Sequence, residues 1–244
     1  MTLAQATINV RKKIKSFVKS IVSFSAVTLL ALSFRSFIAE PFRIPSGSMK
    51  NGLLIGDYIF VSKITYGYSR HSLPFSLPLI KNRIFYKEPK RGDVTVFRPP
   101  YQTKMHYIKR IIGLPGDKIK ITNCNLIVND MQIDKNYLGT WLDLDIGINM
   151  DVYTEELDGK RYETIYNNNT PKTHWSNNTR EFIVPKNSFF VLGDNRNHST
   201  DSRFSEVGFI PKNNLVGKAK MIIFSFNSKN KLLFNSKRFF KLIQ

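Results

Sequence analysis

A short uncharged segment near the N-terminus sets the first limit on what this chain can fold into. Residues 20–34 carry no charged side chain, and as a helix rising about 1.5 Å per residue they would extend roughly 22 Å. The hydrocarbon core of a membrane is thicker, at roughly 30 Å. Lys19 and Arg35 can extend their charged ends toward lipid headgroups, which lengthens the usable segment. The sequence therefore predicts one transmembrane anchor over residues 17–39.

A cleavable secretory signal is the main alternative for this segment, because such signals also place basic residues before a modest apolar stretch. The best small-residue cleavage candidate, at 31–33, lies inside the apolar run, which favours an uncleaved anchor. The basic residues within 1–16 predict that this N-terminus stays in the cytoplasm and that the chain after residue 39 is translocated. We therefore expect a single-pass protein of the plasma (inner) membrane with an extracytoplasmic, periplasmic body.

The charge of the chain is strongly positive. Its 37 Lys and Arg against 18 Asp and Glu give a formal net charge of +19, which would attract an anionic partner such as phospholipid or nucleic acid. No arginine-rich run, zinc-finger spacing or aromatic RNA-binding motif accompanies the charge, so nothing points to nucleic-acid recognition. We expect a solvated basic surface, a phospholipid membrane as partner and no nucleic acid.

Metal and nucleotide chemistry find no support in the sequence. The four histidines are scattered, and no Gly-rich phosphate loop precedes a helical pattern, so neither a metal site nor a cofactor is expected. Cys124 is the only cysteine, which excludes a disulfide within the chain. Cysteine content therefore does not decide the compartment.

The body after residue 39 shows the pattern of a mostly β protein. Short apolar runs are separated by Gly-Asp and Asn-Asp pairs, which is typical of antiparallel strands joined by turns. Asn129 and Asp130 predict a hairpin turn. We expect an antiparallel catalytic core over 40–122 and 187–226, a smaller β-rich insertion over 123–186, and a basic tail over 227–244 that caps the fold or rests on the membrane. The expected strands are Tyr58–Val61, Val94–Phe97, Lys118–Ile121, Leu126–Ile133, Phe182–Val184, Phe189–Leu192 and Lys220–Phe226.

A nucleophile is suggested by the sequence Pro-Ser-Gly-Ser-Met at 45–49, where proline and glycine can shape a tight loop around two hydroxyls. The Gly-x-Ser-x-Gly elbow of α/β hydrolases is absent. Lys109 lies in a strand-like apolar stretch and could act as a base if burial lowers its pKa from about 10.4. The alternative is that Lys109 and Arg110 are alternate-facing surface residues of a strand, as Lys-Arg pairs usually are.

Several motifs, taken together and in their order along the chain, resemble those of the bacterial type I signal peptidase family. The resemblance runs from the anchor to about residue 217, outside the insertion. It rests on Pro45–Met49, Gly56-Asp57, Arg91–Asp93, Tyr107–Asp117, Gly193–Arg196 and Ser199 with Asp201–Arg203.

The resemblance implies a membrane-bound serine endopeptidase that removes N-terminal signal peptides from exported preproteins through an acyl-enzyme. It implies that Ser48 is the nucleophile and that Lys109 accepts and later returns its proton. The Ser46 hydroxyl and the Ser48 backbone N–H would form the oxyanion hole, and Ser199 would hold the lysine amine.

The resemblance also implies supporting and substrate-binding residues. Asp194 and Asp201 would pair with Arg110 and Arg203 and fix the strand that carries the base. Signal peptides would bind as an added strand, with small side chains of an Ala-x-Ala site in shallow apolar pockets. We expect a monomer. The expected groove residues are Phe42, Ile44, Pro45, Met49, Tyr107 and Ile108.

The sequence departs from the usual family pattern at two places. Asn51-Gly52 stands where a Pro-Thr is common, and Asn197-His198 stands where an acidic and an amide residue are common. We hypothesise that His198 makes activity sensitive to pH. A His198→Asn variant with an unchanged pH profile would dismiss that hypothesis.

Two other functions are compatible with parts of the sequence. A self-cleaving repressor protease would share the serine and lysine chemistry, but the apolar span stands where such proteins carry a DNA-binding module. A membrane-anchored, catalytically silent peptide-binding protein would keep the groove without cleavage.

Overall fold

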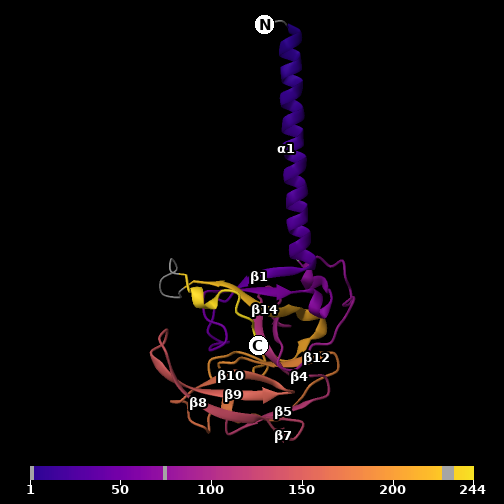
Figure 1. Cartoon of the computed structure of the whole chain (residues 1–244). Coiled ribbons are helices and arrows are strands. Elements are labelled where there is room, and N and C mark those ends of the chain that lie inside the picture. The colour runs from indigo at the N-terminus through magenta and orange to yellow at the C-terminus, as the bar shows by residue number, and fades with distance from the viewer. Residues whose placement is uncertain (1–2, 74–75, 227–233) are drawn as a thin grey trace.

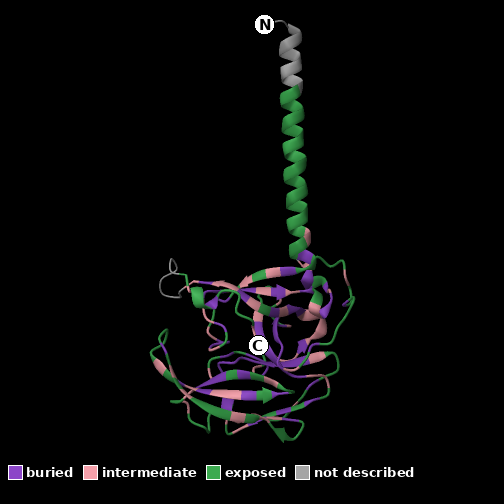
Figure 2. Ribbon diagram, viewed as in Figure 1, coloured by how far each residue is buried: buried purple, intermediate pink, exposed green. Residues whose placement is uncertain are grey.

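One long helix projects from a β-rich body in the computed structural model, which describes residues 3–73, 76–226 and 234–244 (Figure 1). Helix α1 covers Leu3–Phe37 and contains neither Gly nor Pro, the residues that most disfavour a helix interior. Its segment Lys12–Phe37 is long and apolar enough to cross a membrane by length and composition. Figure 2 colours most of that segment as exposed, except near its end at the body. The predicted N-terminal apolar helix is therefore confirmed.

Contacts at the C-terminal end of α1 attach the helix to the body. Arg35 pairs with Glu40 at 2.6 Å, and the buried Lys63 pairs with the same carboxylate at 3.0 Å. The Tyr68 hydroxyl donates to the carbonyl of Phe37 at 2.6 Å. Two ion pairs and one neutral hydrogen bond therefore hold the end of the helix against the body.

The central sheet of the body has seven strands, and its hydrogen-bonded pairs are antiparallel. The expected antiparallel, mostly β core is confirmed. Alternate residues of Asp57–Ser62 are buried, as in a strand with one face turned to the core, although the sequence shows a continuous apolar run at 58–61. In spatial order the strands are β1 (Ala39–Arg43), β2 (Asp57–Ser62), β14 (Leu215–Ser225), β3 (Val94–Phe97), β4 (Tyr107–Gly113), β12 (Ser188–Leu192) and β13 (Ile210–Pro211).

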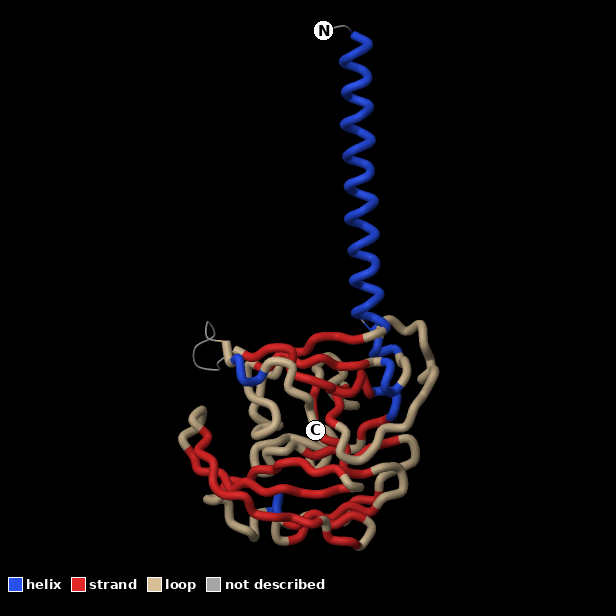
Figure 3. The backbone as a smooth tube through the Cα atoms, viewed as in Figure 1, coloured by secondary structure: helices blue, strands red, loops and turns tan. Residues whose placement is uncertain are grey.

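Two smaller sheets form the part of the body farther from α1 (Figure 3). Asn129 and Asp130 join β6 to β7 and both have positive φ, 51° and 65°, as a type I′ hairpin turn requires. The predicted hairpin is therefore confirmed. The four-stranded sheet is ordered β11 (Phe182–Ile183), β5 (Lys118–Thr122), β6 (Asn125–Val128), β7 (Met131–Gln132), and the three-stranded sheet β10 (Lys160–Asn167), β9 (Ile148–Leu157), β8 (Asp134–Asp143).

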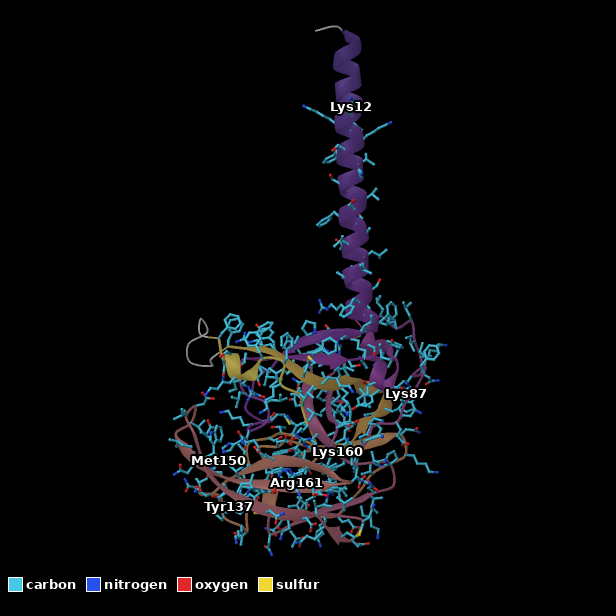
Figure 4. The ribbon with its side chains drawn as sticks, in the orientation of Figure 1. Lys12, Lys87, Tyr137, Met150, Lys160 and Arg161 are labelled. Carbon is cyan, nitrogen blue, oxygen red and sulfur yellow. The ribbon has the colours of Figure 1, made fainter. Side chains whose placement is uncertain are left out.

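Strands β8, β9 and β10 lie within 123–186, where the sequence showed few apolar alternations. A small apolar cluster on this sheet is built on Met150, Val152 and Ile165, and Leu157 and Tyr162 of the same sheet join a second core cluster. Polar residues interrupt the apolar ones along both strands. Figure 4 labels Tyr137 and Met150 on this sheet, with Lys160 and Arg161 where β10 begins. The β5–β6 hairpin crosses the expected boundary at 122/123, so the four-stranded sheet takes strands from both sides of it.

The described part of the tail, residues 234–244, returns to the body. The Ile243 N–H donates to the carbonyl of Lys220, and Ile243 packs against the main core. Arg238 makes a bidentate pair with the buried Asp57, at 2.9 and 2.6 Å. This part of the tail therefore caps the fold. The first part of the expected tail, residues 227–233, lies outside the described residues. It contains the Leu-Leu pair at 232–233.

Candidate active site

A cleft of about 460 Å³ lies between the loop after β1, strand β4 and the loop after β12. Residues 45–48 form one side, and Tyr107, Ile108 and Lys109 of β4 form another. Asn195 and His198 contribute from the third segment. Three motifs that are far apart in the sequence therefore meet at one hollow in the body.

Ser48 and Lys109 are in direct contact inside this cleft. Lys109 Nζ donates to Ser48 Oγ at 2.6 Å and to the carbonyl of Ile108 at 3.0 Å. Ser48 is 8% exposed and Lys109 is 4% exposed. Strand β4 is buried along almost its whole length, which excludes the alternative that Lys109 and Arg110 lie on a solvated strand surface.

Burial lowers the pKa of Lys109 to about 8, because removing water from the amine disfavours its charged form. Asp201 and Asp194 oppose this by favouring the ammonium, and Arg203 acts in the same direction as burial. A lysine with this pKa is neutral in a substantial fraction of molecules near pH 8. It can then accept a proton from a hydroxyl that it contacts.

The backbone around Ser48 is held by the loop that follows β12. The Asn195 N–H donates to the Ser48 carbonyl, and Asn195 Nδ2 donates to the Gly47 carbonyl, both at 3.1 Å. Ser46 Oγ lies 3.5 Å from Ser48 Oγ. Asn195 belongs to the Gly193–Arg196 motif, but its contact with the serine loop, almost 150 residues away in the chain, has no local signal in the sequence.

Close approach at Gly193 brings two segments of the site together. A Cβ at Gly193 would lie 2.2 Å from Ser199 Oγ and 2.5 Å from the Ser48 carbonyl oxygen, so only glycine fits here. Within the described residues, Ser199 Oγ is buried and has no hydrogen-bond partner of ordinary geometry. The structure therefore places Ser199 beside the serine loop without a bond to Lys109.

Two buried ion pairs flank the candidate catalytic residues. Arg110 meets Asp194 through two bonds of 2.8 and 2.7 Å, and Arg203 meets Asp201 through bonds of 2.8 and 2.9 Å. Burial favours the neutral acid at Asp201, but the Arg203 guanidinium and the hydrogen bonds to this carboxylate, among them one from the Gly193 N–H, together lower the pKa of Asp201. These are the pairings that the sequence resemblance implied.

The expected groove residues divide into two groups in the structure. Pro45, Tyr107 and Ile108 line the cleft, and Phe42 stacks edge-on against His106, another lining residue. Ile44 and Met49 are 2% and 1% exposed and belong to the main core. The structure does not bring those two side chains to the cleft.

His198 also lines the cleft, and its Nε2 lies 3.4 Å from Asn167 Nδ2. Across residues 3–73, 76–226 and 234–244, no cluster of three or more His, Cys, Asp or Glu side chains could hold a metal ion.

Comparison with known proteins matches most of the chain. A family model described as signal peptidase, peptidase S26, covers residues 14–224. Signal peptidase I of Rickettsia typhi is 44% identical over 217 residues, which span 86% of this chain and 81% of that protein. Signal peptidase I of Rickettsia massiliae is 44% identical over 215 residues, spanning 83% of this chain and 78% of that protein.

A crystal structure of a signal peptidase I from Enterococcus faecalis is 26% identical and covers 54% of this chain and 97% of that chain, with a TM-score of 0.35. A likeness at this TM-score adds nothing to the fold described above.

These matches make the chain a serine endopeptidase, and therefore a hydrolase. It belongs to the signal peptidase family, peptidase S26, as the sequence motifs predicted. Membership in this family supports the removal of signal peptides as its activity.

Proposed function

We propose that this chain removes N-terminal signal peptides from exported preproteins by a serine and lysine mechanism, with Ser48 as nucleophile and Lys109 as base. One observation carries the proposal: Lys109 Nζ lies 2.6 Å from Ser48 Oγ, with both side chains buried in the cleft. A lysine whose pKa is lowered to about 8 can act on a serine without a histidine.

In the first half of the reaction, Ser48 Oγ attacks the carbonyl carbon of the scissile bond while its proton passes to Lys109 Nζ. The tetrahedral intermediate carries a negative oxygen, which the Ser48 N–H and the Ser46 hydroxyl stabilise. Each such donor contributes about 2.7–4 kcal/mol in comparable sites. The C–N bond then breaks, and Lys109 returns the proton to the leaving amine.

In the second half, water attacks the acyl-enzyme, and Lys109 accepts a proton from that water. Collapse of the second tetrahedral intermediate breaks the bond to Ser48 Oγ, which regains a proton from Lys109. The products are the cleaved signal peptide with a new carboxyl end and the mature protein with a new amino end. Asp194 and Asp201, paired with Arg110 and Arg203, hold the two segments that flank the base.

The substrate would lie extended along the cleft, its backbone pairing as an added strand. Apolar walls at Pro45, Tyr107 and Ile108 suit the small side chains of an Ala-x-Ala site. Helix α1 supports a single-pass anchor, and the basic residues before it support a cytoplasmic N-terminus. The body would then act on the periplasmic face of the inner membrane, as a monomer.

The test is cleavage of a preprotein with an Ala-x-Ala site by the detergent-solubilised full chain, followed by mass. We expect wild-type protein to release the mature product, and Ser48→Ala and Lys109→Ala variants to release none. Equal cleavage by all three proteins would assign the activity to a contaminant. Peptide binding by a folded wild type without cleavage would support a silent binding protein instead.

A further inference from the structure

The loop that follows Ser48 is bound by the inserted three-stranded sheet. Lys50 is 3% exposed, and its Nζ donates to both carboxylate oxygens of Asp143 at 2.8 Å and to Asp145 Oδ2 at 2.7 Å. Asn51 Nδ2 donates to Glu163 Oε2 at 2.7 Å. Asp143 ends β8 and Glu163 lies in β10, so two strands of the inserted sheet hold one short loop.

The hairpin tip that carries Asp143 and Asp145 is held by hydrogen bonds of its own. Asp143 and Asp145 belong to the tip of the β8–β9 hairpin, which curls upward at the left of Figure 1. The Gly147 N–H donates to the Asp143 carbonyl at 2.7 Å, and the Asp145 N–H donates to Asp143 Oδ1 at 3.0 Å. These hydrogen bonds close the tip without any contribution from Lys50.

The Lys50 side chain turns back beneath the residue before the nucleophile. A Cβ on Gly47 would lie 3.0 and 3.1 Å from Lys50 Cε and Cδ. A buried ammonium is strongly disfavoured without counter-charges, so Lys50 can occupy this place only while the hairpin tip is docked. Any displacement of the tip would then be passed to Gly47 and Ser48.

The same hairpin tip forms part of the catalytic cleft. Asp143, Asp145 and Ile146 line it together with Ser46, Ser48 and Lys109. Ile146 is 48% exposed, which leaves an apolar surface facing the space where a peptide would lie. The inserted sheet is thus continuous with the site and not a separate appendage.

We propose that Lys50 is a positioning residue that seats the nucleophile loop on the inserted sheet, and that the docked hairpin tip contacts the substrate through Ile146. This inference rests on the proposed function, because it assigns Lys50 a role through Ser48. Lys50 itself bonds the two carboxylates and takes no proton in the reaction. Its removal affects the rate through the geometry of Ser48.

A double-mutant cycle tests the positioning role in the full-length protein. Lys50→Met and Asp143→Asn should each lower kcat by about 10-fold to 100-fold with little change in KM, since a displacement near 1 Å at reacting groups costs about that much. The double variant should be no slower than either single variant, because both remove one contact. Asp145→Asn, at a less buried position, should cause a smaller loss of kcat.

Lys118→Met with Asp130→Asn is the matched control, since this lysine of β5 and the aspartate of the β6–β7 turn also form a pair, but an exposed one with atoms 3.9 Å apart. These variants should retain wild-type kcat. Thermal melting of every variant shows whether it is folded at the assay temperature. If Lys50→Met does not fold, the kcat of Asp145→Asn decides the question in its place.

A second pair of variants tests whether Ile146 contacts the substrate. Ile146→Ser should raise KM several-fold with little change in kcat, whereas Ile183→Ser, at an exposed site outside the cleft, should change neither. An unchanged KM for Ile146→Ser would remove the substrate contact from the proposal.

Ser48→Ala, assayed in parallel, distinguishes a failure of the positioning role from a failure of the proposed function. Folded Lys50 and Asp143 variants with wild-type kcat, or strictly additive losses, would overturn the positioning role while an inactive Ser48→Ala leaves the proposed function standing. Full activity of Ser48→Ala would overturn the proposed function itself.

Discussion

Lys109 Nζ and Ser48 Oγ are 2.6 Å apart although 61 positions separate the two residues in the chain. The contact arises because β4 carries the lysine into the buried side of the central sheet while the loop after β1 folds over it. Both side chains are buried. The lowered pKa of the lysine follows from that burial, and the pH dependence of the proposed reaction follows from the pKa.

We expect kcat/KM for a signal-peptide substrate to rise with pH and to level off above a midpoint near pH 8. Only neutral Lys109 can accept the serine proton, and its pKa is about 8. The measurement is a pH profile from 6 to 9.5 in one buffer series. A His198→Asn variant with the same midpoint would assign the transition to Lys109 and dismiss the His198 hypothesis. A flat wild-type profile would contradict the assignment of the base.

Lys109→Met should be inactive but more stable than wild type at pH 7. The folded pKa of about 8 lies below the value of an unfolded lysine, so the unfolded chain binds the extra proton more readily and folding is penalised. The penalty is about 3 kcal/mol below pH 8 and disappears progressively as pH rises toward about 10.4. Loss of the bonds to Ser48 and Ile108 offsets part of the gain.

Thermal melting at pH 7 and pH 9.5 checks this expectation. The difference in melting temperature between Lys109→Met and wild type should be several degrees at pH 7 and smaller at pH 9.5. A variant that is less stable at pH 7 than at pH 9.5, relative to wild type, would show that the pKa of Lys109 is not lowered in the folded protein.

Much of the fold and the core of the site could be predicted because the signals are local. The apolar run at 58–61, which forms most of β2, and the Asn129-Asp130 turn each occupy a few consecutive residues. The serine and lysine motifs are likewise short, and the family resemblance links them. Strands β8 and β9 were not among the expected strands, because polar residues interrupt the apolar ones along both of them.

Contacts between distant segments could not be predicted from the same patterns. Lys50 meets Asp143 across 93 positions, and neither residue differs in its local sequence from a surface charge. The pairing of Arg196 with Glu155, both almost fully buried, is similarly invisible before folding. Ile44 and Met49 were expected in the groove because their loop holds the nucleophile, but their side chains turn into the core.

Ser46→Ala should lower kcat by about 100-fold to 1000-fold with KM nearly unchanged. In the proposed mechanism its hydroxyl, 3.5 Å from Ser48 Oγ, stabilises the oxyanion only after attack, and loss of one such donor costs about 2.7–4 kcal/mol. Steady-state kinetics with a peptide substrate measures both constants. Ser205→Ala, at an exposed position, is the control and should match wild type. A rise in KM alone would mean that Ser46 binds substrate instead.

Gly193→Ala should abolish activity and destabilise the protein. The added methyl group would meet Ser199 Oγ and the Ser48 carbonyl at distances far below contact, so the serine loop must move. Gly52→Ala is the matched control, because its Cβ would meet nothing closer than 3.7 Å. Adding Ser199→Ala to Gly193→Ala should not restore activity, since the carbonyl clash remains. Activity of the folded double variant near the wild-type level would show that the serine loop tolerates displacement.

Asp194→Asn should destabilise the protein by about 3–5 kcal/mol, because it leaves the buried Arg110 guanidinium without its counter-charge. Arg110 also donates to the carbonyls of Gly92 and Gln244, so its displacement would disturb β4, on which Lys109 lies. Chemical denaturation gives the free energy of unfolding for each variant. Glu156→Gln is the control: its pair with Arg161 is exposed, and such pairs contribute about 0–1 kcal/mol. Equal losses from the two variants would show that the buried pair does not stabilise the strand carrying the base.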